Sequence, residues 1–159
     1  MKREKNTLMK NIKFELSEIE LRYNPKVPAI QKPRIKCSQD AHIQFLDLMD
    51  RTQFNIKEEA AVLFLNRSKR VIGGYKLSSG GITGTVMDIR IVLGIALKCL
   101  ASGIILAHTH PSGELSPSKQ DLDLTLRVME ASKLMDIQLL DHLIITSSSY
   151  LSMTEDDLI

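Results

Sequence analysis

Apolar and polar residues follow one another in a pattern that divides most of the chain into alternating helices and strands. Three segments have apolar positions at helical spacing, which predicts helices over 41–49, 86–102 and 118–135. Four short apolar runs predict strands over 58–66, 71–77, 104–108 and 137–146. The order is therefore helix, hairpin, helix, strand, helix, strand. This order is typical of an α/β or α+β sandwich around a mixed sheet.

The expected ends of the helices rest on residues that favour those positions. The capping residues are, in chain order, Ser38, Thr85, and either Ser116 or Ser118. Asp88 follows Thr85 by three positions, close to a capping-box arrangement. Gly103 is the expected C′ residue of the second helix, because glycine readily adopts the left-handed conformation found there. The last ten residues are expected to form a short polar tail with a few apolar anchors.

The N-terminal part of the chain differs in pattern from the rest. Residues 12–23 alternate in part between apolar and polar positions, which predicts an edge strand. Three prolines make residues 24–36 an extended connector rather than a helix. We therefore place a domain boundary near Ile35, with a basic arm over 1–34 and one domain over 35–159.

Formal charge is distributed unevenly along the chain. Residues 1–36 carry ten Lys or Arg and four Glu, a formal charge of +6, and the remaining residues carry −4. A basic arm on a mildly acidic domain is able to contact nucleic acid or an acidic partner. A solvated N-terminus is the alternative, since the arm lacks interleaved aromatic residues and any nucleic-acid-binding motif.

The sequence shows no feature of a membrane or exported protein. No apolar run approaches the roughly 20 residues needed to cross a bilayer. The basic N-terminus lacks the apolar segment of a signal peptide. Cys37 and Cys99 lie far apart, and neither belongs to a CxxC pair, so the chain has neither a disulfide framework nor a thiolate zinc site. We expect a cytoplasmic protein without membrane contact.

Two histidines and an aspartate stand where a buried strand ends and a helix begins. His108 and His110 are two positions apart on an extended segment, so their side chains point to the same side. Asp121 lies in the first turn of the next helix, where the helix dipole favours a carboxylate. Two imidazoles and one carboxylate suit Zn²⁺, and three protein ligands leave one position open, as in catalytic sites. The sequence predicts one zinc ion per chain, with Asp121 as a mere cap residue the alternative.

A hydrolytic zinc site also needs a group that takes a proton from water. Glu58 and Glu59 open the strand that we expect beside the one ending at His108, so either carboxylate is a candidate base. Ser118 stands three residues before Asp121 and is able to offer its hydroxyl to the oxyanion of the transition state. The alternatives are a solvated strand start for the glutamates and a simple N-cap for Ser118.

Three further features are weaker candidates for chemistry. Asp141 and His142 form a second acid–imidazole pair, for which we favour a structural histidine, with a role supporting the metal ligands as the alternative. His42 is expected to be exposed on the first helix. The glycine-rich segment 78–84 is neither GxGxxG nor a P-loop, so phosphate binding there is not expected.

At these residues the sequence resembles the JAMM (MPN+) metalloprotease superfamily, whose pattern is H-x-H-P, six residues, S-x-x-D, and a glutamate upstream. His108, His110, Pro111, Ser118 and Asp121 match this pattern with complete spacing. More narrowly, the chain looks like the bacterial RadC family over 35–159. The resembling segments are 60–66 (AAVLFLN), 80–85 (GGITGT), 104–113 (IILAHTHPSG), 117–121 (PSKQD) and 140–144 (LDHLI).

The resemblance implies a three-layer α-β-α sandwich similar to JAMM and cytidine-deaminase domains, and zinc ligation by the two histidines and the aspartate. It also implies Glu58 as the general base, with Glu59 as the fallback, and hydrolysis of amide or isopeptide bonds in a protein or peptide substrate. The RadC family name is associated with DNA repair. Thr109 departs from the family's usual His-Asn-His, but its side chain is expected to point away from the metal.

The sequence therefore favours a zinc-dependent hydrolase. The alternative is a nucleic-acid-associated accessory protein with a structural or vestigial metal site, supported only by the basic arm. A deaminase-like reaction would need a pair of cysteine ligands, which Cys37 and Cys99 do not supply. The sequence identifies neither the substrate nor the oligomeric state.

Overall fold

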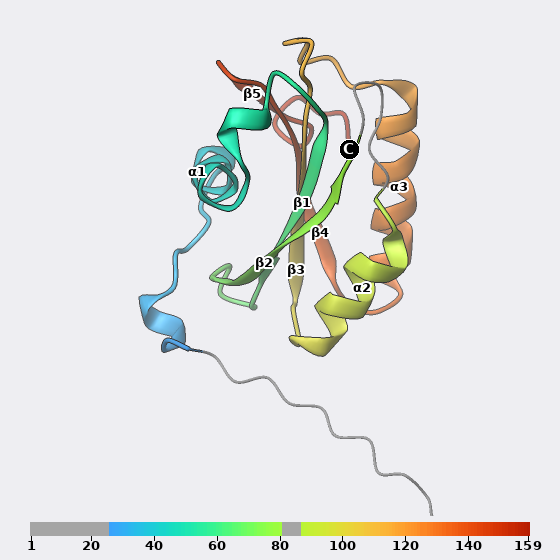
Figure 1. The fold of residues 1–159 in the computed structure, drawn as a ribbon. Helices are drawn as coiled ribbons and strands as arrows, with labels where there is room; N and C mark the ends of the chain where they lie inside the picture. The colour runs from blue at the N-terminus through green and yellow to red at the C-terminus, as the bar shows by residue number, and fades with distance from the viewer. Residues whose placement is uncertain (1–25, 81–86) are drawn as a thin grey trace, which may run out of the picture.

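The computed structural model describes residues 26–80 and 87–159, and within them it forms three layers around one mixed sheet (Figure 1). The elements in chain order are η1 (Ala29–Gln31), α1 (Ser38–Leu48), η2 (Arg51–Gln53), β1 (Glu59–Leu65), β2 (Val71–Ser79), α2 (Ile89–Lys98), β3 (Gly103–Thr109), α3 (Lys119–Lys133), β4 (Gln138–Ile145) and β5 (Tyr150–Ser152). Helix α1 covers one face of the sheet, and α2 and α3 cover the other (Figure 1). The predicted fold class, an α-β-α sandwich around a mixed sheet, is confirmed.

The described strands are ordered β2-β1-β3-β4-β5 across the sheet. β1 runs antiparallel to both β2 and β3, β3 runs parallel to β4, and β4 runs antiparallel to β5. Helix α3 connects the two parallel strands, as the crossover of a βαβ unit does. The carboxyl ends of β3 and β4 therefore lie side by side, close to where α3 begins.

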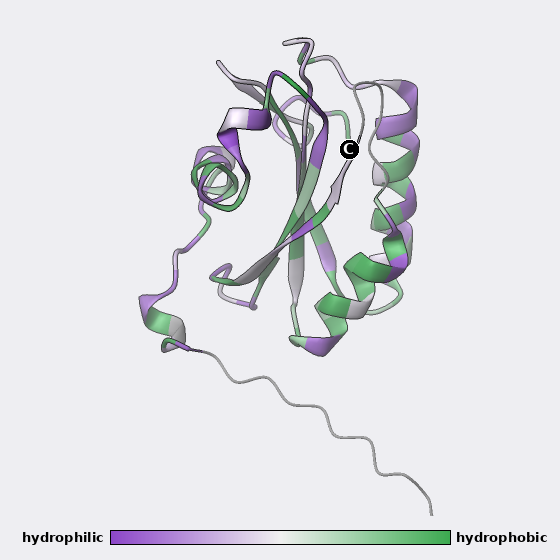
Figure 2. Cartoon of the chain, viewed as in Figure 1, coloured by the Kyte–Doolittle hydropathy of each residue, from purple (hydrophilic) through white to green (hydrophobic). Residues whose placement is uncertain are grey.

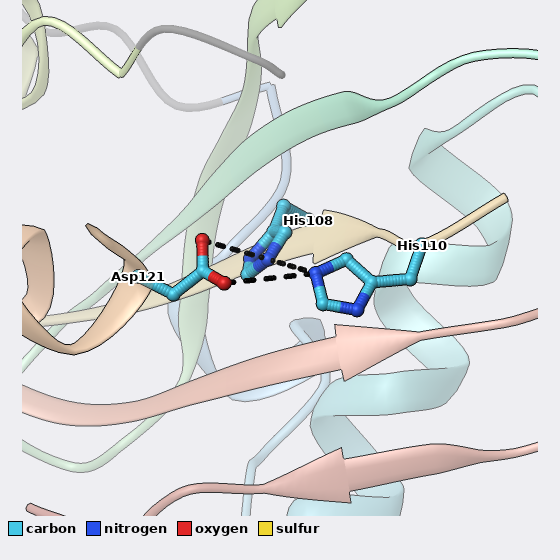
Figure 3. Close-up of side chains that lie close together, drawn as sticks. All are labelled: His108, His110 and Asp121. Carbon is cyan, nitrogen blue, oxygen red and sulfur yellow. Dashed lines mark hydrogen bonds and ion pairs between the residues drawn. The ribbon is translucent and has the colours of Figure 1, made fainter. Parts of the chain in front are cut away.

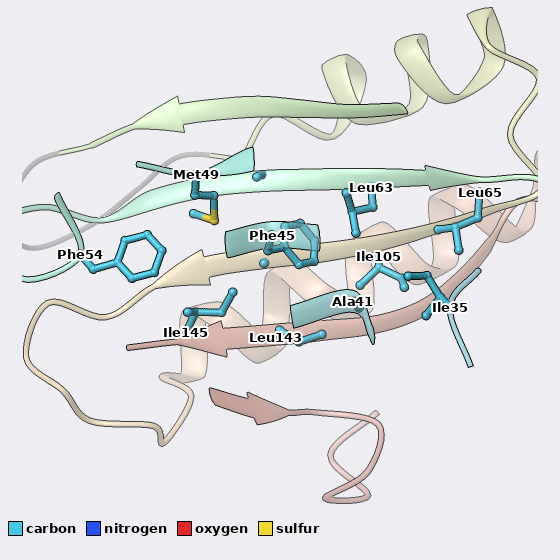
Figure 4. Close-up of a cluster of buried hydrophobic side chains, with 12 residues drawn as sticks. Ile35, Ala41, Phe45, Met49, Phe54, Leu63, Leu65, Ile105, Leu143 and Ile145 are labelled. Carbon is cyan, nitrogen blue, oxygen red and sulfur yellow. The ribbon is translucent and has the colours of Figure 1, made fainter. Parts of the chain in front are cut away.

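The central strands are apolar on both faces because both faces are covered by helices. Every residue of β1 and β3 is buried. One cluster packs against α1, with Phe45 over Leu63 and Leu143 among its members (Figure 4). The other contains Val62 and Leu106 and packs beneath α2 and α3. Figure 2 shows α2 as largely hydrophobic, and α3 as a mixture of hydrophobic and hydrophilic positions.

The ends of two helices differ from the prediction. Cys37, rather than Ser38, is the N-cap of α1, and the carboxylate of Asp40 accepts the N–H of Lys36 at 2.8 Å. In α2, Asp88 is the N-cap and accepts the N–H of Arg90 at 2.9 Å. The predicted cap Thr85 lies outside the described residues.

The C-terminal end of α2 also differs from the prediction. Helix α2 ends at Lys98, and Leu100, three residues before the expected glycine, adopts the left-handed conformation with φ of 55°. Gly103 is instead the first residue of β3, where an added Cβ would lie 3.0 Å from Cδ1 of Leu140. The glycine is thus explained by close packing between strands rather than by a helix end.

Two other predictions are corrected, one for the C-terminal residues and one for His42, which packs against them. The expected polar tail contains β5, which pairs with β4 through Leu143 and Ser152. This strand is too short to produce a hydrophobic period in the sequence. His42 is half-buried rather than exposed, because its ring stacks on Tyr150 with ring centroids 4.3 Å apart.

The N-terminal predictions can be followed only in part. The predicted strand over 12–23 and most of the basic arm lie outside the described residues. The expected connector contains the single 3-10 turn η1, and Arg34 then forms an isolated β-bridge with Arg70. None of the described helices is long and apolar enough to cross a membrane.

Candidate metal centre

The two histidines reach the site because of the alternation of side chains along β3. His108 lies opposite Ala60 of β1 and faces the same side as Leu106, toward α2 and α3. Thr109 ends the strand and faces the α1 side, and His110 follows on the side of His108. Figure 3 shows both imidazoles turned toward Asp121.

A tight turn brings Asp121 back toward the histidines. Gly113 has φ of 79° and donates its N–H to the carbonyl of His110 at 3.0 Å. A glycine is favoured here because side chains with a Cβ rarely adopt this conformation. Helix α3 begins six residues later, and Asp121 lies in its first turn.

The ligand atoms of the three residues lie within 4.8 Å of one another, and theirs is the one group of this kind in the described part of the chain. Nε2 of His108 lies 2.9 Å from Nε2 of His110 and 3.3 Å from Oδ1 of Asp121. Nε2 of His110 lies 3.7 Å from Oδ2 of Asp121. Ligand atoms around a tetrahedral zinc ion, with bonds of 2.0–2.1 Å, are about 3.3 Å apart. The three residues therefore fit a metal ion of this kind.

Hydrogen bonding of His110 leaves its lone pair free for a metal. Its Nδ1 lies 2.7 Å from the carbonyl oxygen of Glu114. Because a carbonyl only accepts, Nδ1 donates, and Nε2 of the neutral ring carries the lone pair that faces Asp121. The side chains of His110 and Asp121 are 13% and 20% exposed, whereas that of His108 is 2% exposed, so solvent reaches the centre from the side of His110 and Asp121.

Asp121 is held by a reciprocal capping box with Ser118. The Ser118 hydroxyl donates to Oδ2 of Asp121 at 2.6 Å, the Ser118 N–H donates to the same oxygen at 2.7 Å, and the Asp121 N–H donates to the hydroxyl oxygen at 3.1 Å. Burial raises the pKa of Asp121, but its contacts with the imidazoles of His108 and His110 and with the hydroxyl of Ser118 hold the pKa well below its usual value. The carboxylate is therefore ionised and oriented.

The pKa of His110 is raised above its ordinary value. The main cause is the hydrogen bond that the protonated ring donates to Asp121, and burial opposes it. The carbonyl of Glu114 and the negative charges of Asp121 and Glu58 add to the increase. The charge of Glu58 makes the smallest of these contributions.

The two candidate bases stand differently toward the centre. Glu59, the first residue of β1, donates its N–H to Oγ1 of Thr109 at 2.8 Å, on the α1 side of the sheet. Its Oε1 lies 3.5 Å from Nζ of Lys57, and its Oε2 is buried without a hydrogen-bond partner. Glu58 immediately precedes the strand and is half-buried. Thr109 thus interacts with Glu59 and turns away from the ligands.

Two further residues contact the centre: His142, for which the sequence predicts a supporting role only as the alternative, and Thr125, which the sequence does not single out. His142 of β4 lies with Nε2 at 2.8 Å from Nδ1 of His108, and its Nδ1 lies 2.6 Å from Oγ1 of Thr125. The contact with His108 arises because the parallel register places His142 opposite Leu106. Thr125 follows Asp121 by four positions, one helical turn, and this spacing was the only available signal.

Asp141 is separate from the centre. Its carboxylate accepts the Ser152 hydroxyl at 2.6 Å and the Thr154 N–H at 3.1 Å, so it holds the C-terminal segment against the sheet. The neighbouring acid and imidazole therefore point to opposite faces of β4 and do not act as a pair.

The fold and the site together define a class of protein, an α-β-α domain with a His-His-Asp group at one end of its sheet. A family model, the RadC-like JAB domain, matches residues 35–158. The chain belongs to this family.

Named relatives support the same assignment. The chain is 48% identical over 99 residues to a UPF0758 protein of Flavobacterium johnsoniae, covering 62% of this chain and 43% of that protein. It is 38% identical over 135 residues to a UPF0758 protein of Porphyromonas gingivalis, covering 84% and 60% respectively. For a UPF0758 protein of Staphylococcus carnosus, identity is 37% over 142 residues, covering 89% and 60%. The chain spans about half the length of the curated relatives it matches.

Proposed function

We propose that this chain is a zinc-dependent hydrolase that cleaves amide or isopeptide bonds in a protein or peptide substrate. The observation that carries the proposal is the convergence of His108, His110 and Asp121 at spacings near those of tetrahedral zinc ligands. Imidazole and carboxylate together suit zinc better than magnesium, which prefers oxygen ligands. Membership of a JAB-type family supports the same reaction class.

The three residues would hold a zinc ion where His110 and Asp121 are partly exposed, so water and substrate would be able to reach it. When bound in such a site, a zinc ion lowers the pKa of a coordinated water to about 7 and polarises the scissile carbonyl. The protein supplies the geometry: the Ser118 hydroxyl and N–H hold Oδ2 of Asp121, while Oδ1 faces His108. The Glu114 carbonyl orients the ring of His110.

Glu58 is the general base in this proposal. Its carboxylate takes a proton from the attacking water and then gives it to the nitrogen of the leaving amine. Support comes from the influence of its charge on His110, and from its place two residues before Ala60, which lies opposite His108. Glu59 is a poorer candidate because alternation along β1 puts its side chain on the same face as Ala61, which packs on the α1 side of the sheet.

Ser118 has two tasks in the proposal. Its hydroxyl proton is donated to Asp121, so its first task is to orient the ligand. Stabilisation of the oxyanion requires that this proton turn from Asp121 toward the substrate as negative charge develops. Nucleic-acid contact through the basic arm stays a prediction from the sequence.

The test compares Glu58→Gln with its neighbour Glu59→Gln in zinc-loaded protein. The substrates are fluorogenic peptides and lysine-linked isopeptides, and zinc content is measured on the same samples. We expect Glu58→Gln to keep its zinc and lose about 100-fold or more in kcat, since general-base catalysis contributes 10²- to 10⁴-fold. Glu59→Gln should retain activity within a few-fold. Full activity of Glu58→Gln, or no hydrolysis of either substrate class by the wild type, would contradict the proposal.

A further inference from the structure

We infer that His142 and Thr125 are positioning residues for the metal centre, linked in a buried relay of hydrogen bonds that fixes which nitrogen of His108 carries the proton. The relay begins at the main-chain carbonyl of Asp121 and ends at Nδ1 of His108. This inference rests on the proposed function, because it describes how the protein prepares His108 as a metal ligand.

The relay consists of three short contacts. Oγ1 of Thr125 lies 2.6 Å from the carbonyl oxygen of Asp121 and 2.6 Å from Nδ1 of His142. Nε2 of His142 lies 2.8 Å from Nδ1 of His108. Thr125 and His142 have no exposed surface and His108 is 1% exposed, so water does not replace any of these partners.

Counting protons gives the relay its direction. A hydroxyl has one proton and a carbonyl can only accept, so a Thr125 hydroxyl that donates to Asp121 must accept from Nδ1–H of His142. His142 then has a bare Nε2, which accepts Nδ1–H of His108. His108 is left with its lone pair on Nε2, the atom that faces His110 and Asp121.

The opposite direction is incompatible with a metal ion at this place. If Thr125 donated to His142, every proton along the relay would move by one link. His108 would then hold its proton on Nε2, where a ligand needs a lone pair. Because the Thr125 hydroxyl donates to the Asp121 carbonyl, Nε2 of His108 keeps the lone pair that a metal ligand needs.

The relay also joins the elements that supply the ligands. Thr125 and Asp121 lie on α3, His142 on β4 and His108 on β3. Its two ends are both ligand residues, since the main chain of Asp121 accepts at one end and the ring of His108 donates at the other. A histidine that served only to fill the core would not need acceptors and donors in this order.

The test uses two matched pairs of variants in the full chain. His142→Gln places an amide oxygen near the position of Nε2 and keeps an acceptor for His108, whereas His142→Leu removes it. Thr125→Ser keeps the hydroxyl, whereas Thr125→Val removes it at nearly constant volume. For each protein, Zn²⁺ affinity is measured by competition with a chromophoric chelator, and the visible spectrum of the Co²⁺ form is recorded. Melting of the metal-free protein reports folding.

We expect His142→Leu to weaken Zn²⁺ binding by about 10- to 100-fold, as loss of partners of metal ligands does, and to alter the Co²⁺ spectrum. His142→Gln should recover most of the affinity. Thr125→Val should lose about 10-fold, while Thr125→Ser stays within a few-fold of the wild type. The Thr125 pair decides the matter if His142→Leu does not fold.

Two results overturn the inference in different ways. Wild-type affinity and spectrum in the folded His142→Leu and Thr125→Val proteins would refute the relay while leaving the metal centre intact. Equal losses of Zn²⁺ affinity by the two variants of each pair would also refute the relay, because neither the acceptor at position 142 nor the hydroxyl at position 125 would then affect metal binding. Absence of Zn²⁺ binding by the wild type would instead refute the metal centre, and with it the relay.

Discussion

At the residue scale, the two imidazoles of the centre have different surroundings. His108 is enclosed by the sheet and contacts His142 from one side and the other ligands from the opposite side. His110 is partly exposed and is fixed by one main-chain carbonyl. His110 is therefore the more accessible of the two histidines to solvent.

The raised pKa of His110 gives a signed dependence of stability on pH. A group whose folded pKa exceeds its unfolded value stabilises the fold fully below the unfolded value, near 6.5, and this stabilisation disappears as pH rises through the folded pKa. We expect His110→Gln to destabilise the metal-free protein more at pH 5.5 than at pH 8.5. Urea unfolding at both pH values measures this, and an equal effect at both would contradict the assigned interaction with Asp121.

The same shift predicts how metal affinity changes. A histidine must lose its proton to bind a metal, so Zn²⁺ affinity should increase with pH across the raised pKa of His110.

Ser118 should matter for both the helix and the ligand. Ser118→Ala removes the N-cap of α3 and one donor to Asp121, and we expect a loss of about 0.5–2 kcal/mol in the free energy of unfolding. Ser116→Ala is the matched control, because Ser116 is exposed and lies just before the cap. Chemical denaturation of the metal-free proteins measures both. Equal stability of the two variants would show that the capping box contributes nothing.

The sequence predicts the residues whose spacing is local. His108, His110 and Asp121 lie within fourteen positions of one another, and the turn between them follows from local residue types. The role of His142 depends on the register of two strands separated by a helix, which no local pattern specifies. The choice between Glu58 and Glu59 likewise depends on which face of β1 each side chain takes.

At the scale of elements, the strands were easier to predict than the helix ends. β1 and β3 are buried along their whole length and are mostly apolar because both faces of the sheet are covered. Helix ends are harder to predict because a single residue, such as a glycine, is equally compatible with a helix end and with close packing in a strand. Gly103, for example, lies in a strand because of its close approach to Leu140, while Leu100 takes the left-handed position.

Gly103 allows a direct test of this packing. Gly103→Ala places a Cβ 3.0 Å from Leu140, and overpacking of this kind costs about 1–3 kcal/mol. Gly73→Ala in β2 is the control, since no described atom lies within 4 Å of its added Cβ. We expect denaturation to show a loss for Gly103→Ala only. Unchanged stability of Gly103→Ala would contradict the packing explanation.

At the scale of the whole molecule, the topology places the centre at one end of the sheet. The carboxyl end of β3, beside its parallel neighbour β4, meets the beginning of β1 and the first turn of α3 (Figure 1). Sites in open α/β sheets commonly lie outside the carboxyl ends of parallel strands. The fold thus brings together side chains from elements that are distant in sequence, and the RadC-like JAB match covers all of these elements.

The proposed activity depends above all on the binding of one zinc ion by His108, His110 and Asp121. The decisive measurement is zinc content by emission spectroscopy, on the 159-residue chain without a histidine tag, after loading with Zn²⁺ and removal of the excess. We predict about one zinc per chain for the wild type and for the control His42→Ala, which alters a histidine that stacks on Tyr150 instead of joining the metal group. Folded His108→Ala, His110→Ala and Asp121→Ala should each hold little zinc. A zinc-free wild type, or ligand variants that keep their zinc, would contradict the account.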